Sequence, residues 1–124
     1  MQTNPYQTYK QQSVLTMTPA EMLLKLYDET IKQLSAAEIY IGEKNILKSN
    51  DALQRAQKIL NYLKATLNFE YDISNNLSAL YDYFVRLIVQ ANVQKSSEPI
   101  REVLPMVQEL RDTFAQAAKQ SKVS

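Results

Sequence analysis

The chain of 124 residues carries 14 Lys and Arg against 13 Asp and Glu, for a formal net charge of +1, and contains no Cys and no His. This length predicts one domain with its own core. No run of basic residues could neutralise several phosphates, so nucleic acid is not the expected partner. The lack of cysteine favours a reducing compartment, and we expect a cytoplasmic protein. Without a signal-peptide pattern or an apolar run of about eighteen residues, neither export by that route nor membrane insertion is expected.

Residues 1–17 predict an N-terminal arm that docks on the rest of the chain. Asn4, Pro5, Tyr6 and Tyr9 make this segment too aromatic for a solvated tail and too short for an independent element. Two interpretations stay open. The tyrosines cover the end of the chain's own bundle, or they fill a groove that a partner later occupies, and both can hold in one protein.

The first helix is predicted over residues 18–41. Thr18 can accept a hydrogen bond from the backbone N–H of Glu21, and Pro19 suits the first helical position. Gly42, the only glycine, is expected to end the helix in the left-handed conformation. The predicted core stripe of this helix is Leu23, Leu26, Tyr27, Thr30, Leu34, Ala37 and Ile41.

The second helix is predicted over residues 46–67 and the third over residues 74–94. Residues 68–72 connect them, and Asp72 or Ser74 is expected to cap the third helix. The stripe of the second helix is Ile46, Leu53, Ala56, Ile59, Leu60, Leu63 and Leu67.

The fourth helix is predicted over residues 98–119, with its start marked by the Ser97-Glu98-Pro99 sequence. Pro105 lies inside it and removes one backbone hydrogen bond, so we expect a kink or a short break. Its inward residues are Ile100, Val103, Leu104, Val107, Leu110, Phe114 and Ala117. Four helices joined by short connections predict an all-α, antiparallel up-down-up-down four-helix bundle over residues 18–120, followed by a tail at 121–124.

The residue types present argue against an enzyme. Ferritin-like bundles use Glu-x-x-His pairs, and this chain has no histidine. One glycine cannot build a phosphate-binding loop, and neighbouring acids such as Asp28 and Glu29 on a helix surface are usually just solvated. We therefore expect no catalytic residue, no metal site and no cofactor, which leaves binding as the function.

The third helix has more apolar surface than one core can cover. Val85, Val89 and Val93 form a row well round the helix from its core stripe. Tyr83 flanks a polar ridge made of Ser78, Asp82, Arg86 and Gln90. The helix lacks the Lys/Arg-rich face of a membrane-binding helix, so a protein partner is the better interpretation. Self-association through this helix, as a structural or adaptor bundle or a weak homodimer, is the alternative. The core stripe itself is Leu77, Leu80, Tyr81, Phe84, Leu87, Ile88 and Ala91.

Five segments occur in order along the chain: NPYQTYKQQSV, TPAEMLLKLYDE, the Leu67-Asn68 step, NLSALYDYFVRLIVQAN and ELRDTF. Together they resemble the flagellin export chaperone family known as FliS, over nearly the whole chain. The resemblance implies a cytoplasmic chaperone that binds the C-terminal segment of flagellin, prevents premature polymerisation and delivers flagellin to the flagellar type III export gate. It also implies client helices lying in apolar grooves, and an N-terminal segment that covers part of the groove in the free chaperone.

The resemblance implies partner-binding positions residue by residue, and the arm tyrosines also match positions tied to export-gate contact. The positions are Asn4, Pro5, Tyr6 and Tyr9 in the arm, Leu26, Tyr27 and Asp28 in the first helix, Leu67 and Asn68, and Leu80, Tyr81, Asp82 and Tyr83 in the third helix, to which the surplus row adds Val85, Val89 and Val93. Three departures stand out. Glu29 replaces a common glycine, Phe114 replaces the usual tryptophan, and the connection over residues 69–73 is a little shorter than common.

Overall fold

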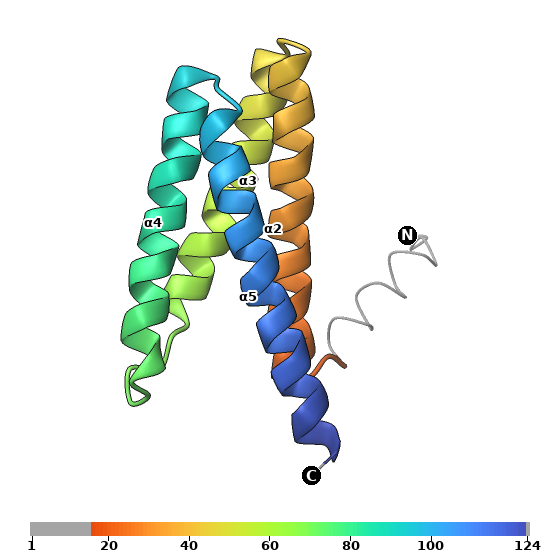
Figure 1. Cartoon of the computed structure of the whole chain (residues 1–124), viewed down its shortest axis with the longest axis vertical. Helices are drawn as coiled ribbons and strands as arrows, with labels where there is room; N and C mark the ends of the chain where they lie inside the picture. Colours follow the sequence, from red (N-terminus) through yellow and green to blue (C-terminus); the bar gives the residue numbers. More distant parts are fainter. Residues whose placement is uncertain (1–15, 124) are drawn as a thin grey trace, which may run out of the picture.

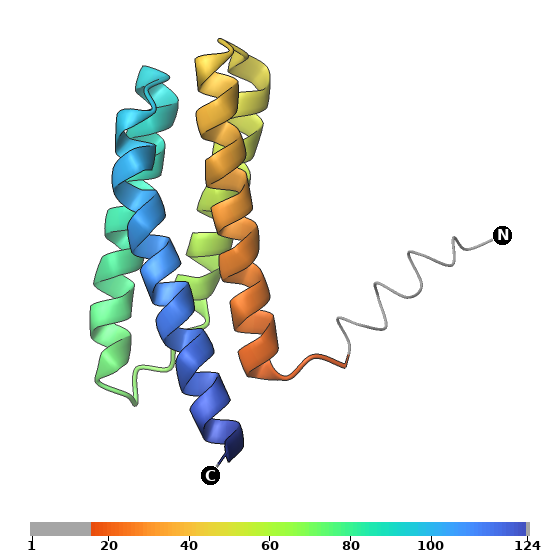
Figure 2. The ribbon, with the colours of Figure 1, turned by 45° about the vertical axis from the view of Figure 1, so that its right-hand side comes forward.

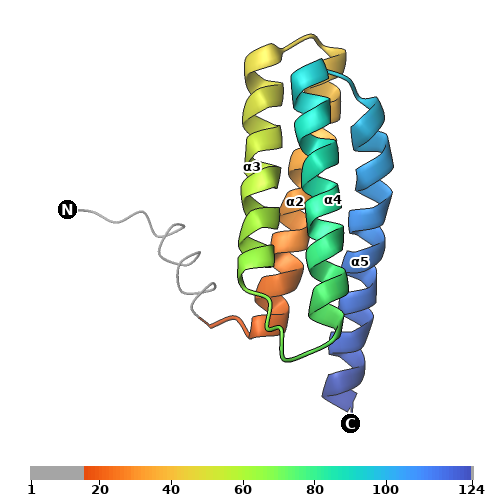
Figure 3. The ribbon, with the colours of Figure 1, turned by 90° about the vertical axis from the view of Figure 1, so that its left-hand side faces the viewer.

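The structure, a computed structural model, describes residues 16–123 as four antiparallel helices (Figure 1). They are α2 (Pro19–Gly42), α3 (Ile46–Ala65), α4 (Ile73–Gln94) and α5 (Glu98–Val123). Each helix packs against the next, and α2 also packs against α5, which closes the bundle (Figures 2 and 3). The predicted all-α four-helix bundle is confirmed. Residues 1–15 of the predicted arm lie outside the described residues.

The core lies where the four predicted stripes meet. Its buried apolar members are Tyr27, Leu34, Ala37, Ala52, Leu53, Ala56, Leu60, Leu63, Leu77, Tyr81, Phe84, Leu87, Ile88, Ala91, Ile100, Val103 and Val107. Two predicted core residues are wrong. Ile46 is 63% exposed because α3 begins there, at the end of the bundle. Ala117 is exposed near the C-terminal end of α5, which runs past the neighbouring helices (Figure 3).

The helix ends follow local hydrogen bonds. The cap at Thr18 is confirmed, because its hydroxyl accepts from the backbone N–H of Glu21 at 3.1 Å. The left-handed conformation predicted at Gly42 is wrong: Gly42 is the last helical residue of α2, and Lys44 takes the left-handed conformation with φ of 59°. The N–H of Lys44 bonds to the carbonyl of Ile41 and so satisfies one of the last carbonyls of the helix.

Two further caps differ from the prediction, and α5 has no break. Asp72 precedes α4 but makes no side-chain cap bond, and it is Ser96 rather than Ser97 whose hydroxyl accepts from the N–H of Glu98.

Helix α5 continues through Pro105, which is exposed, so solvent can reach the carbonyl of Arg101 that has lost its donor. In length, α3 ends at Ala65 instead of residue 67, and α5 continues to Val123 instead of residue 119.

The bundle consists of two similar helical hairpins, α2–α3 and α4–α5. A constant shift of 54 positions relates the buried residues of α2 and α4, pairing Tyr27 with Tyr81, Thr30 with Phe84, Leu34 with Ile88 and Ala37 with Ala91. Another constant shift relates α3 to α5 and pairs Leu53 with Ile100, Ala56 with Val103 and Leu60 with Val107. Each hairpin also has one lysine with a positive φ in its turn, Lys44 and Lys95.

The two hairpins are joined across the core by their tyrosines. The hydroxyls of Tyr27 on α2 and Tyr81 on α4 lie 2.5 Å apart in a hydrogen bond, and both rings are buried. Burial raises the pKa of both phenols above the ordinary value of 10, and the shared hydrogen bond raises the pKa of Tyr27 further. Both groups are therefore neutral at physiological pH. The ring of Phe114 stacks on Tyr27 with centroids 5.6 Å apart, which ties α5 to the same point.

The turn between α3 and α4 is organised by Asn68. The carbonyl of Asn68 accepts from the hydroxyl of Ser74 at 2.6 Å and from the N–H of Tyr71 at 3.2 Å. The side-chain oxygen of Asn68 accepts from the N–H of Glu70 at 3.0 Å. These three bonds satisfy the backbone of a turn that belongs to no helix, so the turn has a defined shape.

We expect Tyr81→Phe to lower the free energy of unfolding by about 1–3 kcal/mol, because the hydroxyl of Tyr27 then stays buried without a partner. The double variant Tyr27→Phe/Tyr81→Phe removes both polar groups and is expected to be much closer in stability to the wild type. Urea unfolding of the wild type, Tyr27→Phe, Tyr81→Phe and the double variant measures the coupling energy between the two hydroxyls. If the losses from the two single variants simply add in the double variant, the hydrogen bond does not join the hairpins.

We expect Asn68→Ala to speed amide hydrogen exchange at Glu70 and to cost about 0.5–1.5 kcal/mol of stability, because one turn acceptor is lost. Asn75→Ala is the matched control, since Asn75 is exposed and its side chain has no hydrogen bond within residues 16–123. Equal exchange at Glu70 in both variants would show that Asn68 does not hold the turn.

Candidate functional site

The outer face of α4 carries an open apolar groove. Val85, Val89 and Val93 form one ridge at a spacing of four residues, and Arg86, Gln90 and Gln94 form the next. The space between the two ridges is about 470 Å³. Ridges at this spacing are the surface into which a second helix packs. The groove therefore has the shape of a docking surface for a helix.

Exposure increases along the valine row. Val85 is partly buried against the core, Val89 is 41% exposed and Val93 is 79% exposed. The opposite face of the same helix is fully packed, since Phe84, Ile88 and Ala91 have no exposed surface. Complete burial of a valine side chain contributes about 1.5 kcal/mol or more by transfer from water. The bundle gains only part of that free energy at Val89 and little of it at Val93.

One edge of the groove is held by a chain of polar contacts. The guanidinium of Arg86 lies 5.9 Å from the centre of the Tyr83 ring, a cation–π distance. The hydroxyl of Tyr83 donates to the carboxylate of Glu102 on α5, and this bond raises the pKa of Tyr83. Arg86 is the only charged residue that lines the groove. The groove is thus mainly apolar, and Tyr83 lies beside its Arg86 ridge towards α5.

Two more apolar grooves lie on other faces of the bundle. One, of about 320 Å³ between α2 and α3, is lined by Met22, Leu26, Lys58, Ile59 and Tyr62. The other, of about 400 Å³, lies between the start of α2 and the end of α5 and is lined by Thr18, Ala20, Glu21, Leu24, Ala115, Ala118, Lys119 and Ser121. Apolar grooves therefore lie on several faces of the molecule.

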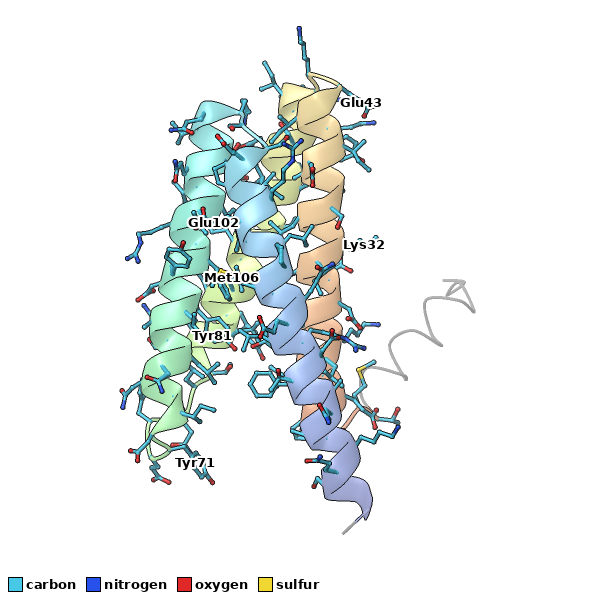
Figure 4. All side chains as sticks on the ribbon, viewed as in Figure 1. Lys32, Glu43, Tyr71, Tyr81, Glu102 and Met106 are labelled. Atoms are coloured by element: carbon cyan, nitrogen blue, oxygen red, sulfur yellow. The ribbon has the colours of Figure 1, made fainter. Side chains whose placement is uncertain are left out.

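The predicted site residues do not form a single site. Tyr27 and Tyr81 face each other inside the core, with Tyr81 directed inward from α4 (Figure 4), and neither ring reaches the surface. Leu26 lines the groove between α2 and α3, and Leu80 and Leu67 are half-buried against the core. The predicted arm residues Asn4, Pro5, Tyr6 and Tyr9 lie outside the described residues.

The two predicted aspartates form ion pairs between the hairpins. Asp28 on α2 accepts from Arg111 on α5 at 2.8 Å, and Asp82 on α4 accepts from Lys64 on α3 at 2.6 Å. The two positions are related by the same shift of 54 residues as the tyrosines. Both pairs are partly exposed, and such pairs contribute up to about 1 kcal/mol each. They orient helices more than they stabilise the fold.

Three features of the structure are not predicted by the sequence. Arg86 and Gln90 form the second ridge of the α4 groove, although the sequence marks them only as a polar ridge. Phe114 is predicted as an inward residue of the fourth helix, but its stacking on Tyr27 is not predicted. Phe69 and Tyr71 are strongly exposed at the end of the bundle, where Figure 4 shows Tyr71. The alternation of apolar and acidic residues in NFEYDI is the sequence signal that could have indicated this exposed apolar turn.

Three other features are not found among residues 16–123. Within residues 16–123, no group of three or more acidic side chains is placed to hold a metal ion. None of the helices in this part of the chain is long and apolar enough to cross a membrane. No buried polar side-chain atom in this range lacks a hydrogen-bond partner.

Comparison with known proteins gives consistent matches. The family model "Flagellar protein FliS" matches residues 2–121. The flagellar secretion chaperone FliS of Bacillus subtilis (strain 168) is 36% identical over 119 residues, which cover 96% of this chain and 90% of that protein. The flagellar secretion chaperone FliS of Salmonella typhimurium is 30% identical over 107 residues, covering 84% of this chain and 79% of the relative.

A crystal structure of a bacterial flagellar chaperone shares the fold. Its TM-score is 0.78 at 22% sequence identity, and the match covers 93% of this chain and 95% of that one. Because the family model matches almost the whole chain and two relatives reach 30% identity or more, this chain belongs to the FliS family of flagellar secretion chaperones.

Proposed function

We propose that this protein is a cytoplasmic export chaperone that binds the C-terminal segment of flagellin, prevents its premature polymerisation and delivers it to the flagellar type III export gate. The observation that carries client binding is the two-sided character of α4, which packs one face completely and leaves Val89 and Val93 exposed on the other. Family membership supports the class of client, because the curated relatives are named as flagellar secretion chaperones.

The α4 groove suits an amphipathic helix of the client. The ridge of Val85, Val89 and Val93 would lie in a groove of the incoming helix, and that helix would place its own apolar ridge between the valines and Gln90. Glutamine and arginine at the rim stay solvated when the client is absent. The free chaperone therefore remains soluble while it keeps an apolar docking surface.

A client that wraps the bundle would use more than one groove. Apolar contact yields about 25 cal/mol per Å² of buried surface, and ordering a disordered segment costs about 2–5 kcal/mol. A single short helix on α4 gains little after that cost. Contact of the same client with the groove at Leu26, between α2 and α3, buries further apolar area. Because the client is already bound, its translational entropy is not lost a second time.

The motif residues divide into two roles in this proposal. Leu26 lines the groove between α2 and α3, and half-buried Tyr83 lies beside Arg86 of the α4 groove, so both contact the client directly. Tyr27 and Tyr81 are buried and act through the position of the helices. Asp28 and Asp82 likewise fix helix orientation through their ion pairs, and Asn68 fixes the turn between α3 and α4.

Binding of this kind needs no nucleotide and no covalent step. Client release then depends on competition for the same apolar surfaces, and we assign the competing surface to the export gate. The arm has a corresponding role in the free chaperone. We propose that Tyr6 and Tyr9 cover the groove at the start of α2, where Thr18 lines the wall.

We expect Val89→Asp to weaken binding of a synthetic peptide of the flagellin C-terminal segment by about tenfold or more, because a carboxylate would be buried against apolar client surface. The melting temperature is expected to change little, since Val89 is 41% exposed. Calorimetric titration and thermal unfolding are the two measurements. Gln54→Asp places the same charge at an exposed position on α3 and serves as the control.

Unchanged peptide affinity in Val89→Asp would remove the α4 row from the client interface. A loss of stability of about 2–5 kcal/mol, the range of a core Leu→Ala change, would show that the row belongs to the core. Sedimentation of the free wild-type chain addresses the alternative function. A tight dimer that Val89→Asp dissociates would identify self-association as the use of this row.

Deletion of residues 1–10 is expected to increase the fluorescence of an apolar dye, because the groove lined by Leu24 and Ala118 becomes accessible. The full chain with Tyr6→Ser and Tyr9→Ser is expected to show the same increase, while Gln2→Ala and Thr3→Ala leave it unchanged. Equal dye binding in all these proteins would exclude the arm as a cover.

A further inference from the structure

The turn between α3 and α4 displays three large apolar side chains to solvent. Phe69 is 57% exposed, Tyr71 is 64% exposed and Ile73 is 57% exposed. They lie at the end of the bundle, as Figure 4 shows for Tyr71. Single exposed apolar residues are ordinary, but three within five consecutive positions form a patch.

The backbone of this turn is fixed. Asn68 accepts hydrogen bonds from the N–H groups of Glu70 and Tyr71 and from the hydroxyl of Ser74, which is itself buried. The apolar side chains are therefore held outward by a structured turn. A surface that is ordered before binding loses less conformational entropy on contact than a flexible loop does.

Acidic residues alternate with the apolar ones. Glu70 lies between Phe69 and Tyr71, and Asp72 lies between Tyr71 and Ile73. No Lys or Arg occurs from residue 65 to residue 85, and neither carboxylate forms an ion pair within residues 16–123. Asp82 differs, because Lys64 neutralises it at 2.6 Å. The patch is therefore apolar, and its two negative charges have no ion-pair partner within residues 16–123.

We propose that residues 69–73 are a second docking surface, which binds a basic segment of a protein partner. Arg or Lys side chains of that segment pair with Glu70 and Asp72 and lie over the rings of Phe69 and Tyr71, while its apolar side chains contact Ile73. The negative charge repels nucleic acid and anionic lipid, which leaves a basic protein surface as the partner.

This surface is separate from the groove of the proposed function. Ile73 begins α4, and Val89 lies roughly 24 Å further along the same helix at ~1.5 Å per residue. A partner at the turn therefore leaves the α4 groove open, so one molecule can hold a client and the second partner together. The inference does not depend on the identity of the client.

The test titrates isotope-labelled full chain with a synthetic peptide of alternating leucine and arginine, followed by NMR. We expect the largest shifts at the amides of residues 69–73, and no comparable shifts with the leucine–glutamate counterpart. The double variant Glu70→Gln/Asp72→Asn is expected to bind about fivefold to thirtyfold more weakly, in line with two exposed ion pairs. Phe69→Ser/Tyr71→Ser is expected to lose the binding, with an unchanged melting temperature because both rings are exposed.

The double variant Ile46→Ser/Leu47→Ser is the matched control, since these residues are as exposed as the turn but lie at the other end of the bundle. It is expected to bind the leucine–arginine peptide like the wild type. Shifts confined to residues 85–94, equal binding of the acidic peptide, or full affinity after Glu70→Gln/Asp72→Asn would each overturn the proposal. Binding to phosphatidylglycerol vesicles that is lost in Phe69→Ser/Tyr71→Ser would overturn it in favour of a membrane surface.

Discussion

The hydrogen bond between Tyr27 and Tyr81 joins the two helical hairpins at the centre of the bundle. Two phenols can be buried there only because each serves the other, and Phe114 covers the Tyr27 ring from α5. The ion pairs Asp28–Arg111 and Asp82–Lys64 also join the two hairpins, at the surface of the bundle. The orientation of α4, and with it the direction in which its valine row points, depends on this arrangement.

The periodicity of the sequence predicts the four helices and most of the core, because burial of one stripe follows from local spacing. Helix ends are less predictable. Gly42 has the conformational freedom to end α2, yet the helix hydrogen bonds continue past it and Lys44 takes the left-handed conformation. Ile46 fits the heptad pattern but has no neighbour to cover it, since it begins α3. Spacing alone does not say where the surrounding helices stop.

Part of the candidate site could also be predicted from the sequence. Val89 and Val93 are identified by subtraction, as the apolar residues of α4 that its core stripe does not include. The partnership of Tyr27 and Tyr81 could not be predicted, because the residues are 54 positions apart and meet only when the hairpins pack. The exposure of Phe69 depends on the shape of the turn, which the hydrogen bonds of Asn68 decide.

The packing of α2 against α5 brings together the first and last helices of residues 16–123. Because a ribosome makes the chain from the N-terminus, the α2–α3 hairpin is complete while α5 has not yet emerged. During that interval Tyr27 lacks Phe114, and Asp28 lacks Arg111. The nascent bundle therefore has an open side along α2 until α5 emerges, so this chaperone of other chains passes through a stage in which part of its own core is uncovered.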